Sequence, residues 1–175
     1  TNAAKASLYF GYRIGYVVHS DTVWGSTSYM AVPNRIEISS YEELKKIGND
    51  IAYPLVANYE LTKDIDASSS KFKPIGDSVH VFAGTFDGKN HTVSNVVIDE
   101  PGRDFAGFFG VADGATIRNL KLVNTKVTGS WYVGALAGEI DSSRVANVVS
   151  LNGDVYGESF IGGLMGASRS TYINV

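Results

Sequence analysis

The stretch from residue 105 to residue 175 repeats itself with a fixed period, which constrains the fold more than any other feature of the chain. The segment FAGFFG at 105–110 recurs as VGALAG at 133–138 and as IGGLMG at 161–166. The closing glycines Gly110, Gly138 and Gly166 are evenly spaced, at positions i, i+28 and i+56. A fixed period between about 20 and 50 residues is typical of a solenoid or another repeat array. The sequence predicts stacked coils, each one period long.

Each repeat contains three short apolar segments, for example 105–110, 116–123 and 126–129, separated by Gly, Asp, Asn and Ser. These segments are too short for helices and rich in β-branched and aromatic residues, so they are expected to be strands joined by turns. Three strands in one period indicate one coil of a right-handed parallel β-helix, an all-β fold. Equivalent residues would then stack at about 4.8 Å between coils.

The period also predicts which residues stack. The expected inward ladders are Phe108, Leu136 and Leu164, then Ile117, Val145 and Tyr172, then Leu120, Val148 and Val175. The asparagines Asn119, Asn147 and Asn174 are expected to form a ladder of side-chain amides, which would satisfy polar groups at a partly buried turn. Small residues at Gly107, Ala135 and Gly163 would let a neighbouring backbone approach closely.

Upstream of the repeats, residues 36–175 are expected to form one β-helix domain that begins with a short helix. Ser40 is an N-cap candidate, and Leu44, Ile47 and Ile51 form an apolar stripe, which predicts a helix over 40–51 that covers the first coil. Residues 55–104 contain strand-like segments without the exact period, so these coils are expected to be less regular than the repeats at 105–175.

Residues 1–35 are unusually rich in aromatic side chains, and two strand-like segments, 8–18 and 22–32, predict a hairpin. The favoured role is a cap on the end of the solenoid, because end coils need to be covered. The alternative is a binding face, since exposed Tyr and Trp stack on sugars and on partner proteins. The candidate ligand-binding residues are Tyr9, Tyr12, Tyr16 and Trp24 in this segment, together with Trp131 and Tyr132 in the repeats.

Composition excludes several classes of partner. A net charge of −3 provides no electrostatic basis for binding nucleic acid, and no apolar run approaches the roughly 20 residues of a membrane-spanning helix. The absence of Cys excludes disulfides and thiolate metal sites.

The chain begins at Thr1 and stops within its last repeat, so it is expected to be a fragment of a longer protein. Its open C-terminal coil would be covered by the rest of that protein or by other copies.

Some parallel β-helices are enzymes that act on polysaccharides, so paired carboxylates were considered as catalytic candidates. Asp64 and Asp66 would share one face of an extended strand, and Asp113 and Asp141 are equivalent repeat positions. Aspartates in turns usually bond to the local backbone, which favours a structural role over catalysis. Calcium shared between neighbouring turns is a further alternative. We expect no catalytic residues, no bound metal and no cofactor.

Several of these segments together resemble a known family. The Ser-capped helix with Glu43-Leu44, the run YELTKDID at 59–66, FKPIG at 72–76, FAGTFDGKNHTVSN at 82–95 and the glycine repeats occur in this order. From Ile36 to Val175 the chain is similar to the GLUG-motif proteins, bacterial surface and secreted proteins that include adhesins and the N-terminal regions of IgA-cleaving metalloproteases. GGLMG at 162–166 is the best match to the motif, GALAG at 134–138 departs by one Ala, and GFFG at 107–110 is shorter. Residues 1–35 match nothing in that family.

The resemblance implies an extracellular, β-helical, adhesive or stalk-like module without catalytic residues. The leading hypothesis is therefore a non-enzymatic cell-surface or secreted module that serves in adhesion, display or spacing, with a host glycan or matrix protein as candidate partner. The alternatives are a carbohydrate-active β-helix enzyme, either a lyase or a hydrolase, and a self-assembling structural unit whose end coils stack between chains.

Overall fold

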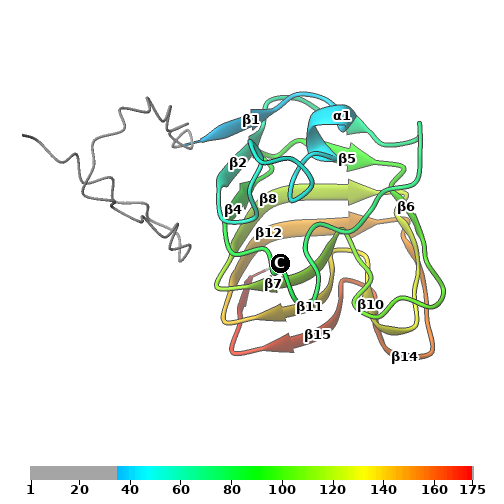
Figure 1. Cartoon of the computed structure of the whole chain (residues 1–175). Helices are drawn as coiled ribbons and strands as arrows, with labels where there is room; N and C mark the ends of the chain where they lie inside the picture. The colour runs from blue at the N-terminus through cyan, green and yellow to red at the C-terminus, as the bar shows by residue number, and fades with distance from the viewer. Residues whose placement is uncertain (1–34, 175) are drawn as a thin grey trace, which may run out of the picture. The chain divides into compact units, whose positions relative to one another are not determined.

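A computed structural model describes residues 35–174, and these form a parallel β-solenoid (Figure 1). The predicted hairpin and cap of residues 1–35 lie outside the described residues, apart from Arg35, and remain a prediction. The predicted β-helix with coils of about 28 residues is confirmed. No helix in the described part of the chain is long and apolar enough to cross a membrane.

The largest sheet runs the length of the solenoid, and its strands are stacked in the order β1-β2-β4-β8-β12-β16. Their bounds are β1 Ile36–Ile38, β2 Asn58–Leu61, β4 Thr85–Asp87, β8 Thr116–Val123, β12 Arg144–Leu151 and β16 Tyr172–Asn174. The short strands β3 (Ile65–Asp66) and β5 (Thr92–Ser94) extend this sheet beside β8. All of these pairings are parallel, as one chain winding in one direction requires.

Register partners along this sheet show how the length of a turn varies. The stacked residues, one from each strand from β2 to β16, are Tyr59, Phe86, Ile117, Val145 and Ile173. The coils that begin at Ile117 and at Val145 contain equal numbers of residues. The coil that begins at Tyr59 is shorter, and the coil that begins at Phe86 is longer. The coils before Ile117 thus differ in length, whereas the two after it are equal. Irregular length is tolerated because the extra residues are accommodated in surface turns.

Three smaller sheets complete the walls. One contains β7 (Phe109–Asp113), β11 (Ala137–Asp141) and β15 (Met165–Arg169). Another contains β6 (Val97–Asp99), β9 (Lys126–Thr128) and β13 (Asp154–Tyr156), and the third contains β10 (Trp131–Gly134) and β14 (Ser159–Gly162). Each regular repeat thus has four strands where the sequence analysis expected three. The glycine motif, expected to be a strand, instead spans the corner between β10 and β11.

The core is a continuous column of apolar side chains from successive coils. Phe108, Leu136, Ile117 and Val145 are fully buried, as the predicted ladders require. One ladder assignment was wrong: Ile173, and not Tyr172, is in register with Val145. Tyr172 pairs with Arg144 on the outer face and is exposed. The asparagine of the last repeat, Asn174, stands one residue earlier relative to the backbone register than Asn119 and Asn147 do, so alignment by asparagine shifts this coil by one residue.

The helix is shorter than predicted. α1 covers Tyr41–Leu44, with Ser40 as N-cap accepting a hydrogen bond from the Glu43 backbone N–H. After Leu44 the backbone tightens into turns, in which the N–H groups of Lys46 and Ile47 donate to the carbonyls of Glu43 and Leu44. Gly48, with a left-handed φ of 76°, then donates its N–H to the Tyr53 carbonyl. Ile51, predicted to belong to the buried stripe, is therefore 94% exposed, whereas Leu44 and Ile47 are buried.

α1 lies at the β1 end of the solenoid (Figure 1), and Tyr41 packs 6.1 Å from the ring of Phe72. The two ends of the described solenoid therefore differ. At the β1 end, Ile38 is fully buried, but at the β16 end Ile173 and Ile161 are 40% and 48% exposed.

Candidate ligand-binding surface

Two of the six predicted binding residues lie in the described part of the chain. Trp131 and Tyr132 begin β10, whereas Tyr9, Tyr12, Tyr16 and Trp24 lie outside the described residues. Trp131 is 47% exposed, and Tyr132 is half-buried.

Tyr132 is the middle ring of a stack that we call the aromatic ladder: Phe105, Tyr132 and Phe160. Its ring centroid lies 4.9 Å from that of Phe105 and 4.7 Å from that of Phe160, with interplanar angles of 2° and 6°. These distances match the spacing of the strands, so successive coils place the rings face to face. Both faces of Tyr132 are covered, and a ligand would meet this ring at its edge.

All three residues of the aromatic ladder adopt a left-handed backbone conformation, with φ of 59°, 58° and 53° for Phe105, Tyr132 and Phe160. This conformation costs a residue with a side chain about 1–2 kcal/mol, and for a bulky residue it is unusual. Each stacked aromatic pair contributes about 0.5–1.5 kcal/mol beyond its buried area. The stack therefore offsets part of the cost of a sharp corner that every repeat needs.

The closing glycines of the repeat motif lie directly beneath these corners. A Cβ atom on Gly138 would lie 2.5 Å from the Phe105 Cα. A Cβ atom on Gly166 would lie 2.5 Å from the carbonyl carbon of Tyr132. Real Cβ atoms do not approach backbone so closely, so each coil needs glycine where it passes under the aromatic corner of the preceding coil. The glycine motif and the aromatic ladder are thus parts of one packing arrangement.

The predicted close approach at the other small residues holds only in part. A Cβ atom on Gly107 would lie 2.6 Å from the Ala137 Cα, as expected, but one on Gly163 would have nothing within 4 Å. Gly163 lies in the last coil of the described chain, so no further coil contacts it.

Trp131 projects beside the aromatic ladder rather than within it. Its ring lies 6.1 Å from Phe160, tilted by 53°, and its register partner in the next coil is the small Ser159. Its backbone N–H is held by the Asp104 carboxylate at 3.2 Å. Because Phe160 is also 52% exposed, the two rings form an apolar patch at the edge of β10 and β14.

Sequence reasoning missed Phe105 and Phe160 as partners of Tyr132. Alignment by the closing glycines placed Phe105 opposite Val133, but the backbone pairs Val133 with Ala106. The first repeat is one residue shorter at its corner, which shifts the register between β10 and β11. Alignment by the first glycine of each motif would have revealed the ladder, because an aromatic residue stands two positions before each of Gly107, Gly134 and Gly162.

The predicted asparagine ladder exists between Asn119 and Asn147, but it does not include Asn174. The Asn147 amide donates to the side-chain oxygen of Asn119 at 3.1 Å, and the Asn119 amide donates to the Asp87 carboxylate at 3.0 Å. Asn174 does not belong to this ladder, because it pairs with Ala146. A second ladder, which the sequence analysis did not predict, runs from Asn124 to Asn95 at 3.2 Å and from Asn95 to Asp66 at 2.9 Å.

The ladders explain why Asn is used at these corners. Asn119, Asn147, Asn95 and Asn124 all have φ between 52° and 59°, a conformation that Asn tolerates better than most residues. Their amides then connect one coil to the next. Each ladder ends on an Asp carboxylate, which accepts the last N–H and has no donor of its own to satisfy.

The carboxylates considered for catalysis are engaged in local bonds. Asp64 accepts from the Thr92 backbone N–H at 2.9 Å and lies 3.2 Å from His91 Nδ1, and these contacts, the backbone bond first, hold its pKa below the usual value. The Asn95 amide and then the Ser68 N–H likewise lower the pKa of Asp66. Carboxyl groups held ionised in this way are poor proton donors near neutral pH.

Asp113 and Asp141 are register partners on adjacent strands, as their equivalent repeat positions predict. The next position in this row is Arg169, which changes the charge from negative to positive. Among residues 35–174, no group of three or more His, Cys, Asp or Glu side chains could hold a metal ion.

Two buried carboxylates bind the irregular coils together. Glu60 lies 2.9 Å from the guanidinium of Arg35 and 3.3 Å from the Lys89 ammonium group. Asp87 accepts from Arg118 Nε at 2.9 Å. Burial alone would raise the pKa of Asp87, but the bonds from Asn119, the Lys89 N–H and Arg118 together hold it below its usual value. These side chains bridge coils, so their arrangement is structural.

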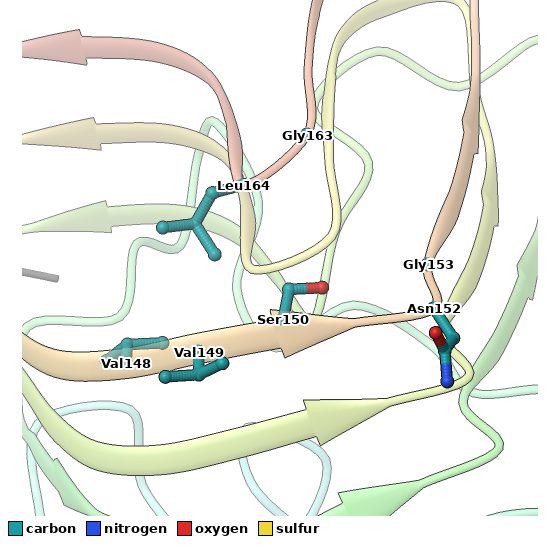
Figure 2. A pocket seen from close by; sticks show the side chains of 7 residues that line it. All are labelled: Val148, Val149, Ser150, Asn152, Gly153, Gly163 and Leu164. Carbon is teal, nitrogen blue, oxygen red and sulfur yellow. The ribbon is translucent and has the colours of Figure 1, made fainter.

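A hollow of about 540 Å³ opens beside the last turn, lined by Val148, Val149, Ser150, Asn152, Gly153, Gly163 and Leu164. Figure 2 shows that β12 forms one side of it and that Leu164 lies across from this strand. The lining is mainly backbone and apolar side chains, without a charged group.

Comparison with known proteins identifies relatives of parts of this chain. Halomucin from Haloquadratum walsbyi is 40% identical over 115 residues, which are 58% of this chain but 1% of halomucin. A protein of Evansella cellulosilytica, provisionally described as a Gly-rich membrane protein, is 29% identical over 96 residues, 53% of this chain and 11% of the relative. The chain thus spans a small fraction of either relative. No family model matches the chain, and no solved structure matches it.

Proposed function

We propose that this chain is a non-enzymatic β-helix module of a secreted or cell-surface protein, which serves in adhesion, display or spacing. The observation that carries the proposal is the row of aromatic side chains held at a fixed spacing on stacked coils, with Trp131 and Phe160 half-exposed at its edge. Rigid, exposed aromatic rings supply contact area at low cost in conformational entropy, which is the chemistry of binding surfaces.

A stalk or display role is supported by the way the coils are connected. Parallel backbone pairing joins each coil to the next along the described chain, and two polar ladders and the aromatic ladder add side-chain contacts between some of these coils. Such a stack is stiff along its axis without disulfides. The bonds that occupy Asp64 and Asp66 favour this role over an enzyme acting on polysaccharides.

The surface location is supported by the names of the two relatives, one halomucin and the other provisionally a membrane protein. The GLUG resemblance belongs to the same proposal. The packing of Gly138 and Gly166 under the aromatic corners provides a structural reason for a repeated glycine motif.

A glycan and matrix-protein binding array with the full chain tests the proposal. Trp131→Ala should abolish binding if the patch at β10 and β14 is the adhesive surface, whereas Trp24→Ala should do so if the N-terminal aromatics bind. Tyr156→Ala is the matched control, because Tyr156 is an aromatic residue of similar exposure, 54%, on another wall.

Absence of binding by the folded wild-type chain would contradict adhesion and leave spacing as its role. Turnover of any glycan on the array by the wild-type chain would contradict the non-enzymatic assignment.

A further inference from the structure

The connection between β4 and β5 bulges from the largest sheet. Both strands pair with β8 (Figure 1): β4 ends at Asp87, in register with Arg118, and β5 begins at Thr92, in register with Lys121. The connecting residues, 88–91, are therefore four in number and stand opposite two residues of β8. Because the two residues in excess have no place in the ladder of β8, the connection forms a turn on the outside of the sheet.

Backbone hydrogen bonds fix the shape of this turn. The His91 N–H donates to the Gly88 carbonyl at 2.7 Å, and the two residues between them, Lys89 and Asn90, have φ of 51° and 65°. This is the pattern of a type I′ turn. The Asn90 N–H also donates to the Asn119 carbonyl at 2.8 Å, which ties the turn to β8. Lys89 and Asn90 at its tip are both exposed.

The side chain of Asn90 differs from those of the asparagine ladders. The ladder asparagines are also left-handed, but their amides bond to the neighbouring coil. The Asn90 carboxamide makes no hydrogen bond to any residue from 35 to 174. Lys89 bends back toward Glu60, with 3.3 Å between its ammonium group and the carboxylate. The free amide of Asn90 is therefore the group that the turn presents to solvent.

The sequence at this tip has a chemical meaning. Asn90-His91-Thr92 is the one Asn-X-Ser/Thr sequence in the 175 residues, with X other than Pro. This sequence is the acceptor for N-linked glycans, which are attached to surface loops of secreted proteins. Thr92 faces outward, because the buried residue of β5 is Val93, and its hydroxyl makes no hydrogen bond within the described chain. Its backbone N–H donates to the Asp64 carboxylate at 2.9 Å.

We propose that Asn90 is an N-glycosylation site, with a lipid-phosphate-linked oligosaccharide as the donor. In the transfer, Asn90 Nδ2 bonds to the anomeric carbon of the first sugar, and the bond from that carbon to the phosphate oxygen breaks. The lipid phosphate leaves with the bonding electrons, and the amide proton passes to a base of the transferase. The site rests on the surface location in the proposed function. The turn and Trp131 belong to different sheets, so a glycan and a ligand would occupy different walls.

Mass spectrometry of the protein purified from the organism that produces it tests the assignment. The expected result is a glycan mass on the peptide that contains Asn90 and on no peptide whose asparagines lie outside the acceptor sequence. Unmodified Asn90 in every molecule would overturn the proposal. The outcome is separate from that of the binding array. A glycan without ligand binding would contradict adhesion alone, and ligand binding by a chain with unmodified Asn90 would contradict glycosylation alone.

Transfer in vitro tests the geometry of the turn. The folded full chain is incubated with a lipid-linked oligosaccharide and a purified oligosaccharyltransferase that accepts the free peptide of residues 85–95, and the intact mass is measured. The wild-type chain and Thr92→Ser should gain one glycan, whereas Asn90→Gly and Thr92→Ala should gain at least about tenfold less. Glycine keeps the left-handed turn, so Asn90→Gly should retain the wild-type melting temperature.

Asn152→Gly is the matched control, because Asn152 is also exposed and left-handed, with φ of 52°, but lies outside an acceptor sequence. It should gain the glycan as the wild-type chain does. A folded wild-type chain that stays unmodified would show that the turn is not an acceptor. Equal modification of Asn90→Gly and the wild-type chain would likewise overturn the proposal, because the glycan would then be attached elsewhere.

Discussion

At the scale of single residues, glycine and aromatic positions are coupled. The left-handed corners at Phe105, Tyr132 and Phe160 bring backbone close to the strand that passes below, and only glycine leaves enough room. The motif glycines thus depend on the packing of a neighbouring coil and not on their own φ, because Gly138 and Gly166 are not left-handed.

Gly138→Ala should therefore destabilise the chain by several kcal/mol, because the new methyl group would overlap the Phe105 backbone. Gly163→Ala, in the same repeat motif with nothing within 4 Å, should change stability by less than about 0.5 kcal/mol. Urea unfolding of both variants checks the difference. Equal destabilisation would mean that the corners do not determine the glycine positions.

At the scale of secondary-structure elements, polar ladders hold neighbouring strands in register. Asn119 and Asn147 sit within the long strands β8 and β12, where a left-handed residue bends the strand and its amide bonds to the next coil. A register shift by one residue would separate these amides and turn core residues outward, so the ladders and the apolar pattern specify the same pairing.

Asn147→Ala should lower the free energy of unfolding by about 1–3 kcal/mol, because it removes a hydrogen bond and leaves a left-handed Ala. Asn174→Ala provides the contrast, since Asn174 lies outside the ladder in β16. Thermal melting of the two variants should separate them. If Asn174→Ala is the more harmful, the register of β16 described here is wrong.

Asp87 makes the strand contacts sensitive to acid. Its pKa is lower in the folded chain than the value of about 3.9 expected in the unfolded chain. The unfolded state therefore binds the proton first, and the contribution of Asp87 to stability, complete above about pH 4, is lost as pH falls through its folded pKa. Asp87→Asn should reduce the loss of unfolding free energy between pH 5 and pH 2. Denaturant titrations at each pH measure this loss. An equal loss in Asp87→Asn and in the wild-type chain would show that Asp87 does not contribute to the acid sensitivity.

At the scale of the whole molecule, the coils of the described solenoid differ in how many neighbouring coils they have. Each coil contacts mainly its neighbours, so local stability should follow the number of neighbours a coil has. The turn that ends in β16 has a neighbour on one side, whereas β8 and β12 lie between others.

Hydrogen exchange of the monomer should consequently be fastest in β14, β15 and β16 and slowest in β8 and the paired part of β12. The measurement is mass-spectrometric hydrogen exchange of the full chain. Uniform exchange in all coils would indicate all-or-none unfolding without a weak end.

Much of the architecture could be predicted from the sequence because a solenoid converts sequence distance into spatial contact. Residues one period apart are stacked, so the repeat determined the parallel coils, the buried ladder of Phe108 and Leu136, and the pairing of Asp113 with Asp141. An apolar side chain at a repeated position has one place to avoid water, which is the interior of the stack.

The repeat period leaves the alignment of side chains between neighbouring coils uncertain by one residue, and the tertiary structure decided this alignment. A one-residue difference at the first corner placed Phe105 on Tyr132, and the last coil paired Ile173 with Val145. Both choices depend on backbone hydrogen bonding and ring stacking between coils, which a motif aligned by its glycines does not contain. The predicted helix gave way to tight turns after Leu44, and only folded neighbours could bring Asp87 and Asp66 to the ends of the asparagine ladders. The sequence by itself determined that coils stack; the contacts between coils determined which side chains meet.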